Sequence, residues 1–289
     1  MIFKFSVFIL ILTSQANAKN FIVGGQDLKP TDPIQASTVG LFDPSPDGKW
    51  GALCTGTLIR RDIAVTAAHC LDGGGAKASL IFGPDLHSKT ATHREVEAVA
   101  INPKYKTHAG KGMDQGDIAL VKFKGGLPKG FKTVPTVSSD SDIRKGGKVT
   151  LAGYGISNSQ TKEGAGKLRR ADVRISNNRP KKSEMILDQS HGRGACHGDS
   201  GGPAYLKRGN KISLAGVTNR GYPSTAPDDC AHKVVYTKLP AYRSWIQKSE
   251  KKLEETKLSK SKVLSRNLKR VPHKHAHVTR TKSIRMKRA

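Results

Sequence analysis

Cysteines, aromatic residues and repeats are scarce or absent in this sequence. Its 289 residues include only four cysteines, and none of them has the Cys-x-x-Cys spacing of a zinc site. No internal repeat of fixed period is present either. With 36% hydrophobic residues the chain can still form one large packed domain or two modest ones, so its core does not depend on metal or on dense disulfides.

Acidic residues are also few, and the resulting charge is unevenly spread. Asp and Glu total 23 against 50 Lys and Arg, which gives a net charge of +27, and residues 247–289 alone hold fifteen Lys and Arg and three Glu. A short helix is expected from Pro240 to Ile246 and onward into residues 248–257, since proline suits a first helical turn. Residues 258–289 have too few apolar side chains to offset their ordering entropy, so 247–289 is predicted to be a basic, largely disordered tail.

The basic tail has two interpretations. It could bind an anionic surface by counterion release, or it could be a solubilising segment that is trimmed after export. It contains no aromatic residue other than histidine, which argues against specific nucleic-acid recognition. His273, His275 and His277 could touch a metal, but a solvated tail is favoured, and we expect no metal or other cofactor.

The first eighteen residues have the features of a secretory signal peptide. Lys4 supplies the positive charge, Phe5 to Leu12 the apolar core, and Ala16-Asn17-Ala18 the cleavage site, so the mature chain should start near Lys19. The alternative, a membrane anchor, needs about 20 apolar residues, and this run is much shorter. Export to an oxidising compartment predicts two disulfides among Cys54, Cys70, Cys196 and Cys230, with three pairings open.

Between Ile22 and Ile246 the chain alternates short apolar runs with Gly, Pro, Asn and Asp. The runs at Ile118–Phe123 and Ile212–Val217 are typical. Many short strands separated by turn signals indicate an all-β barrel or sandwich.

A serine, a histidine and an aspartate in this segment suggest nucleophilic catalysis. Attack by the Ser200 hydroxyl needs a base, for which we choose His69, and a carboxylate that holds the imidazole tautomer, for which we choose Asp117. Glycines around the serine would let the backbone N–H groups of Gly198 and Ser200 form an oxyanion hole. Each residue alone has an ordinary structural explanation, whereas their combination in an exported chain favours an enzyme.

Four motifs in order make the chain similar to the trypsin/chymotrypsin family of serine proteases. They are Ile22–Gly25, which resembles the mature N-terminus of that family, Thr66–Cys70 around the histidine, Asp117–Leu120 around the aspartate, and Gly198–Pro203 around the serine. The resemblance implies a secreted serine endopeptidase that acts on proteins or peptides, and a monomer without a membrane span. It also implies two six-stranded antiparallel β-barrels packed around a catalytic cleft, over residues 22–130 and 131–246, with a short C-terminal helix.

The resemblance further implies the disulfide pairs Cys54–Cys70 and Cys196–Cys230. In the family, cleavage before the first Ile frees an amino group that pairs with the Asp beside the catalytic Ser. Here that pair would be Ile22 and Asp199, after removal of a propeptide of residues 19–21. Phe21 departs from the Lys or Arg that usually precedes this cleavage, and an uncut chain should leave Asp199 without its partner.

The residues of the primary pocket depart from those of trypsin. Gly194 stands where trypsin-like enzymes have an Asp, so nothing would neutralise a buried Lys or Arg, and Val234 should narrow the pocket. We therefore expect cleavage after small or medium uncharged residues. Asn219 and Arg220 replace the usual Ser and Trp of the wall, whereas Gly221 is kept. Arg220 and His197 could favour acidic side chains upstream of the cut, or Arg220 could simply be solvated.

Two other interpretations compete with the enzyme. A catalytically silent homologue could use the fold and the basic tail as a surface-binding module, although this chain keeps all three catalytic residue types. An unrelated basic binding protein would require four coincidental motifs. The few cysteines and the short propeptide favour a bacterial source.

Overall fold

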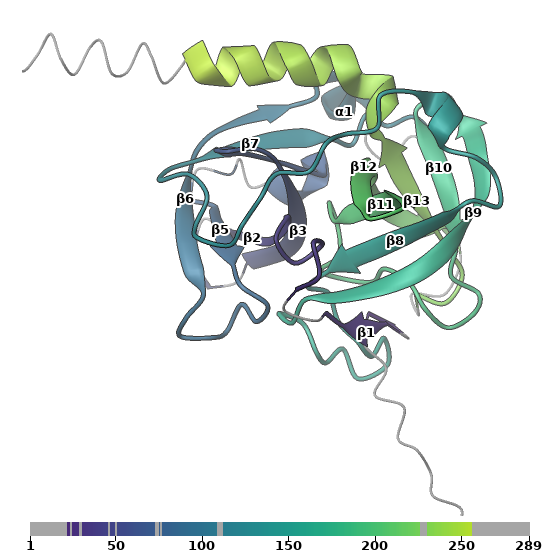
Figure 1. The fold of residues 1–289 in the computed structure, drawn as a ribbon, viewed down its shortest axis with the longest axis horizontal. Helices are drawn as coiled ribbons and strands as arrows, with labels where there is room; N and C mark the ends of the chain where they lie inside the picture. Colours follow the sequence, from purple (N-terminus) through teal and green to yellow (C-terminus); the bar gives the residue numbers. More distant parts are fainter. Residues whose placement is uncertain are drawn as a thin grey trace, which may run out of the picture.

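The computed structural model describes residues 22–23, 25–28, 31–45, 47–49, 51–72, 75, 77–108, 112–225 and 230–255. The expected signal peptide, propeptide and most of the basic tail therefore lie outside the described residues. The described chain forms two antiparallel β-barrels side by side with a helix across one end (Figure 1). This confirms the expected all-β fold.

The first barrel closes in the order β2-β3-β4-β7-β6-β5. Its strands are β2 (Thr38–Pro44), β3 (Gly51–Arg60), β4 (Ile63–Thr66), β5 (Ser79–Phe82), β6 (Thr92–Ile101) and β7 (Ala119–Phe123). The 3₁₀ turn η1 (Ala68–Leu71) and the helix α1 (Pro103–His108) lie in its connections. Its interior is filled by aliphatic side chains together with Phe82 and Phe123, and the ring of Phe82 meets that of Phe131 edge to face.

The second barrel closes through the order β9-β10-β13-β12-β11-β8, with β8 pairing back to β9. Its strands are β8 (Lys148–Gly153), β9 (Arg169–Lys181), β10 (Glu184–Asp188), β11 (Pro203–Arg208), β12 (Lys211–Tyr222) and β13 (Lys233–Lys238). The short strand β1 (Gln26–Asp27) adds to the outer edge of β9, and the 3₁₀ turn η2 (Asp140–Asp142) precedes β8.

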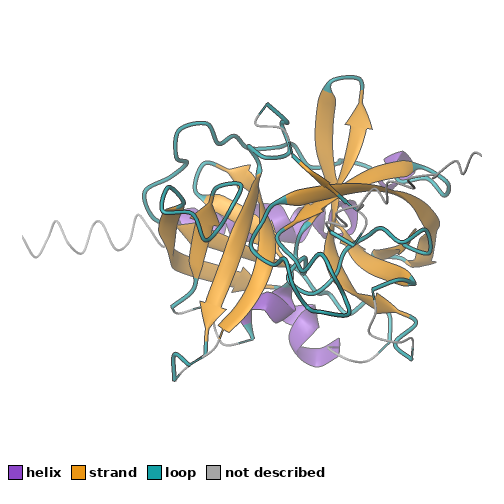
Figure 2. Cartoon of the chain, turned by 90° about the horizontal axis from the view of Figure 1, so that it is seen from below, coloured by secondary structure: helices purple, strands orange, loops and turns teal. Residues whose placement is uncertain are grey.

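Buried tyrosines join the two barrels. The Tyr205 hydroxyl on β11 lies 2.9 Å from Ser37 Oγ and 3.1 Å from Thr38 Oγ1 on the first barrel. The Tyr154 hydroxyl, just after β8, donates to the carbonyl oxygen of Gly83 at 2.8 Å. Because a buried hydroxyl is costly without a partner, these bonds stabilise the contact between the barrels. Figure 2 shows the two groups of strands side by side.

The described part of the chain ends in a helix that covers the first barrel. After η3 (Leu239–Tyr242) it runs over residues 243–255, so the start of the segment assigned to the tail is helical. Leu253 of this helix is buried, and Glu250 forms an ion pair with Arg60 of β3 at 3.0 Å. Figure 1 shows the helix running across the barrel. No helix among the described residues is both long and apolar enough to cross a membrane.

Candidate active site

The first disulfide holds the histidine in place. Cys54 on β3 is bonded to Cys70 in η1, directly beside His69. Ala68, Cys70 and Leu71 are buried around that residue, so η1 is anchored on three sides while the imidazole keeps 29% of its surface exposed. The pairing is the one that the family resemblance implied.

His69 and Asp117 form a doubly hydrogen-bonded unit. The imidazole Nδ1 lies 2.8 Å from Asp117 Oδ2, and the His69 backbone N–H donates to Asp117 Oδ1 at 3.0 Å. Burial alone would lower the pKa of His69, but the hydrogen bond and charge of Asp117, with the charge of Asp72, raise it above the ordinary value of 6.5. A carboxylate on Nδ1 leaves Nε2 of the neutral ring as the proton acceptor.

Ser200 lies in the loop between β10 and β11, where backbone hydrogen bonds reach both barrels. Its carbonyl oxygen accepts from Thr55 N on β3 at 2.8 Å and is 3.6 Å from Cys70 Sγ, the neighbour of His69. The next residue, Gly201, has φ +75°, and a Cβ there would overlap Thr66 Oγ1. The structure thus brings Ser200 to the His69 segment, although no hydrogen bond joins its hydroxyl to the imidazole in the described residues. Such bonds commonly tighten only when substrate binds.

The predicted oxyanion donors are free of competing partners. Among the described residues, the backbone N–H groups of Gly198 and Ser200 donate to no protein acceptor. Gly198 has φ +94°, and a Cβ there would lie 2.8 Å from Gly155 Cα. Thr55 Oγ1 donates to the Gly198 carbonyl oxygen at 2.9 Å, which turns that peptide so that its oxygen faces the first barrel.

Asp199 is buried behind the serine, with 1% of its surface exposed. Its two carboxylate oxygens accept from the backbone N–H groups of Gly155 and Cys196, each at 2.8 Å. Burial raises the pKa of Asp199 to about 6, and those two hydrogen bonds and the charges of Arg169 and His197 oppose the rise. The expected partner Ile22 is also buried, but in the uncut chain its nitrogen is a peptide nitrogen, and no described contact joins it to Asp199.

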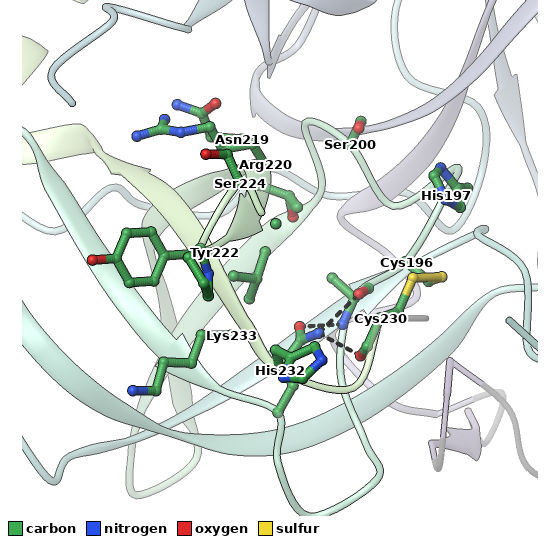
Figure 3. A pocket seen from close by; sticks show the side chains of 16 residues that line it. Cys196, His197, Ser200, Asn219, Arg220, Tyr222, Ser224, Cys230, His232 and Lys233 are labelled. Carbon is green, nitrogen blue, oxygen red and sulfur yellow. Dashed lines mark hydrogen bonds between the residues drawn. A yellow bond between two sulfur atoms is a disulfide. The ribbon is translucent and has the colours of Figure 1, made fainter. Parts of the chain in front are cut away.

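A cavity of about 410 Å³ opens beside Ser200. Four of the predicted pocket residues line it, namely Asn219, Arg220, Gly221 and Val234. The second disulfide, Cys196–Cys230, closes one wall. Figure 3 shows Tyr222 and Lys233 extending outward on the side opposite His197. Among the described residues that line the cavity there is no carboxylate.

Gln189 also lines this cavity, at its base, and no motif in the sequence indicated it. A Cβ on Gly194 would overlap the Gln189 side chain, which shows that the carboxamide fills the space left by the missing pocket residue. Its Nε2 donates to the carbonyl oxygens of Cys230 at 2.9 Å and Ala195 at 3.1 Å, and its Oε1 accepts from Ala195 N at 2.7 Å (Figure 3). The pocket base is therefore neutral and rigid.

Arg220 lines the cavity with 22% of its side chain exposed, and it forms an ion pair within the protein that the sequence did not indicate. Its guanidinium makes a bidentate pair with Glu184 on β10, at 3.0 and 3.1 Å. The Glu184 side chain is 1% exposed and neutralises the arginine. Asn219, beside it, donates to Thr237 Oγ1 at 3.2 Å.

Two groups of metal-ligating residue types occur among the described residues, Cys54-His69-Cys70 and Cys196-His197-Cys230. In each, the two sulfurs are joined in a disulfide. Because metals bind thiolates, neither group is suited to hold an ion.

The two barrels, the His69–Asp117 unit and the serine loop between them define the architecture of a chymotrypsin-fold serine protease. The family model described as trypsin matches residues 22–246, and the chain belongs to the trypsin family. It is 28% identical over 253 residues to a vitellin-degrading protease of Bombyx mori, across 79% of this chain and 85% of that protein. It also matches the solved structure of neuropsin, a serine protease expressed in the limbic system of mouse brain, with a TM-score of 0.62 and 25% identity over 78% of this chain and 98% of that one. The bacterial source stays a prediction.

Proposed function

We propose that the protein is a secreted serine endopeptidase in which Ser200, His69 and Asp117 form the catalytic triad. The observation that carries this proposal is the His69–Asp117 pair, because a carboxylate bonded to both the ring and the backbone of one histidine fixes the tautomer that a base needs. The membership of the trypsin family supports the same assignment.

The reaction would proceed in two halves. As Ser200 Oγ attacks the peptide carbonyl carbon, its proton passes to His69 Nε2, and the carbonyl oxygen becomes an oxyanion bound by the N–H groups of Gly198 and Ser200. His69 then protonates the leaving amine, which departs and leaves an acyl-enzyme. Water, deprotonated by His69, attacks the ester and releases the acid and the free serine.

The pocket favours small or medium uncharged residues before the cleaved bond. Gln189 makes the base neutral, its two N–H groups are already bound, and Val234 takes up space on the wall. A buried Lys or Arg would find no counter-charge among the described lining residues. Turnover of a peptide panel should be best after Ala, Val or Leu, and best turnover after Lys or Arg would refute this specificity.

Cleavage before Ile22 is the proposed activation step. Ile22 adopts φ +37°, a left-handed conformation that is costly for a β-branched residue, by roughly 1–2 kcal/mol. Cutting the Phe21–Ile22 bond releases this restriction on the Ile22 backbone and frees the amino group for Asp199. N-terminal sequencing of active protein should give Ile-Val-Gly-Gly, and it also tests removal of the signal peptide.

Labelling by a fluorophosphonate probe separates an enzyme from a silent homologue. We expect the cut chain to label, Ser200→Ala to abolish the labelling, and Ser224→Ala, which changes a serine in the same pocket, to keep it. No labelling of a chain verified to begin at Ile22 would favour the silent homologue. For the tail, deletion of residues 258–289 should weaken retention on an anionic column if it binds surfaces, and unchanged retention would exclude that role.

A further inference from the structure

Arg169, the first residue of β9, has one of the largest fully buried side chains in the described chain, with 2% of its surface exposed. Its Nη1 donates to the carbonyl oxygen of Gly164 at 2.5 Å, and its Nε lies 3.7 Å from Asp27 Oδ1. Buried guanidinium groups are rare unless their charge is matched. The Asp27 side chain is 68% exposed, so most of its charge is screened by water.

The strand register places the Cβ of Arg169 on the same face of the sheet as the Asp199 carboxylate. Arg169 lies directly opposite Gly153 in the β8–β9 ladder. Side chains of directly opposed residues in an antiparallel pair share a face, with Cβ atoms about 5 Å apart. A Cβ on Gly153 would overlap Asp199 Oδ1. Because Gly153 has no side chain, the carboxylate can lie on this face, near the Cβ of Arg169.

The N-terminal segment reaches Arg169 from the other side. Strand β1 pairs Asp27 with Arg169, five residues after Ile22. Val23 is held on the same barrel, because its carbonyl oxygen accepts from Gly194 N at 2.9 Å. Arg169 thus lies between the segment that is freed by activation and the acid that receives the new N-terminus.

We propose that Arg169 is the positive counter-charge of Asp199 in the uncut chain, so that the serine loop is ordered and partly active before cleavage. The inference rests on the proposed function and makes Arg169 a positioning residue, since it acts through Asp199 and touches no reacting atom. Cleavage before Ile22 would then add a second cation to an existing one, and activation would be graded.

The surrounding charges are consistent with this role. The charge of Asp199 interacts with Arg169 from β9, with His197 from its own loop and with the Tyr236 phenol from β13. The charge of Arg169 also interacts with those of Asp27 and Asp85. Burial raises the pKa of Asp199 to about 6, and Arg169 and His197 keep it from rising further. At neutral pH the carboxylate is therefore charged even without the ammonium of Ile22.

The test compares uncut and cut chains. Phe21→Pro blocks cleavage, with mass spectrometry to verify an intact chain, and an engineered protease site before Ile22 provides the cut form. The rate of fluorophosphonate labelling is measured from pH 5 to 9 in both forms for wild type, Arg169→Gln, Arg169→Lys and the control Arg170→Gln. Arg170 is the next residue on β9 and pairs with Asp32 at 2.7 Å.

We expect the uncut wild type to label measurably and Arg169→Gln to slow labelling of the uncut chain by about tenfold or more, with its acid limb moved to higher pH by about one unit. The cut chain should change less than about threefold, because the Ile22 ammonium replaces the lost charge. Arg169→Lys and Arg170→Gln should retain labelling in both forms.

Three results would overturn the inference. An equal loss in both forms of Arg169→Gln would show a merely structural arginine, and an uncut wild type that never labels while the cut form does would show that Arg169 cannot order the loop. If Arg169→Gln is unfolded at neutral pH, it should refold at pH 5, where Asp199 is protonated, and failure to do so also refutes the role. A cut wild type that does not label removes the proposed function itself, which is a separate outcome.

Discussion

Arg220→Ala should destabilise the protein by about 3 kcal/mol, because it leaves the Glu184 carboxylate buried without its cation. The Glu184 side chain is 1% exposed. Besides the ion pair with Arg220, its carboxylate accepts a hydrogen bond of 3.4 Å from the backbone N–H of Gln115. Breaking a buried pair by removing one partner costs roughly 3–5 kcal/mol. Since 22% of the Arg220 side chain is exposed, the lower end of that range applies.

The assay is urea denaturation in a Ser200→Ala background, which prevents autolysis. Arg179→Ala is the matched control, since Arg179 pairs with Asp140 at 3.3 Å with 73% of its side chain exposed, and such a pair is worth at most about 1 kcal/mol. Glu184→Gln combined with Arg220→Ala removes the stranded charge and should recover most of the loss. If Arg220→Ala costs no more than Arg179→Ala, the pair does not brace the pocket wall and the reasoning fails.

Three further predictions concern the catalytic and pocket residues. In the pH–rate profile, the acid limb of kcat/KM should have its midpoint above pH 6.5, because Asp117 raises the pKa of His69 and the base must be neutral. Asp117→Asn should move this limb to lower pH and reduce kcat by roughly 10⁴-fold. Gln189→Ala should shift the preferred residue before the cut toward larger side chains, measured as kcat/KM for Phe against Ala peptides. Gly201→Ala should abolish labelling while circular dichroism stays native-like, since the new Cβ overlaps Thr66 Oγ1 at φ +75°.

The sequence allowed a role to be predicted only for residues within or near a motif. The proposed catalytic residues, the proposed oxyanion donors and Gly194 all lie within or near short motifs whose chemistry restricts the residue type. The disulfide pairs followed from the family resemblance, since four cysteines alone leave three pairings open. The all-β fold followed from short apolar runs, which depend on local pattern.

Residues paired across the fold could not be predicted in the same way. Glu184 and Arg220 are 36 positions apart, and they meet because β10 and β12 both flank β13. In the sequence Glu184 looks like an ordinary solvated charge, and nothing near Arg220 indicates that Glu184 is its partner. The one available signal for Glu184 is its place at the start of the apolar run Met185-Ile186-Leu187, where a charge must either face solvent or find a partner.

Gln189 and Asp199 bind the same loop, which links the proposed specificity to the proposed activation. Gln189 binds Ala195 through both its nitrogen and its oxygen, and Asp199 binds the next residue, Cys196. The Cys196–Cys230 disulfide and the bond from Gly194 N to Val23 O then tie this loop to the pocket wall and to the N-terminal segment. Because one loop carries both Ala195 and Cys196 at the pocket base and the proposed oxyanion donors Gly198 and Ser200, a charge change at Asp199 should act on substrate binding and on the chemical step together. Cleavage before Ile22 should therefore alter KM as well as kcat.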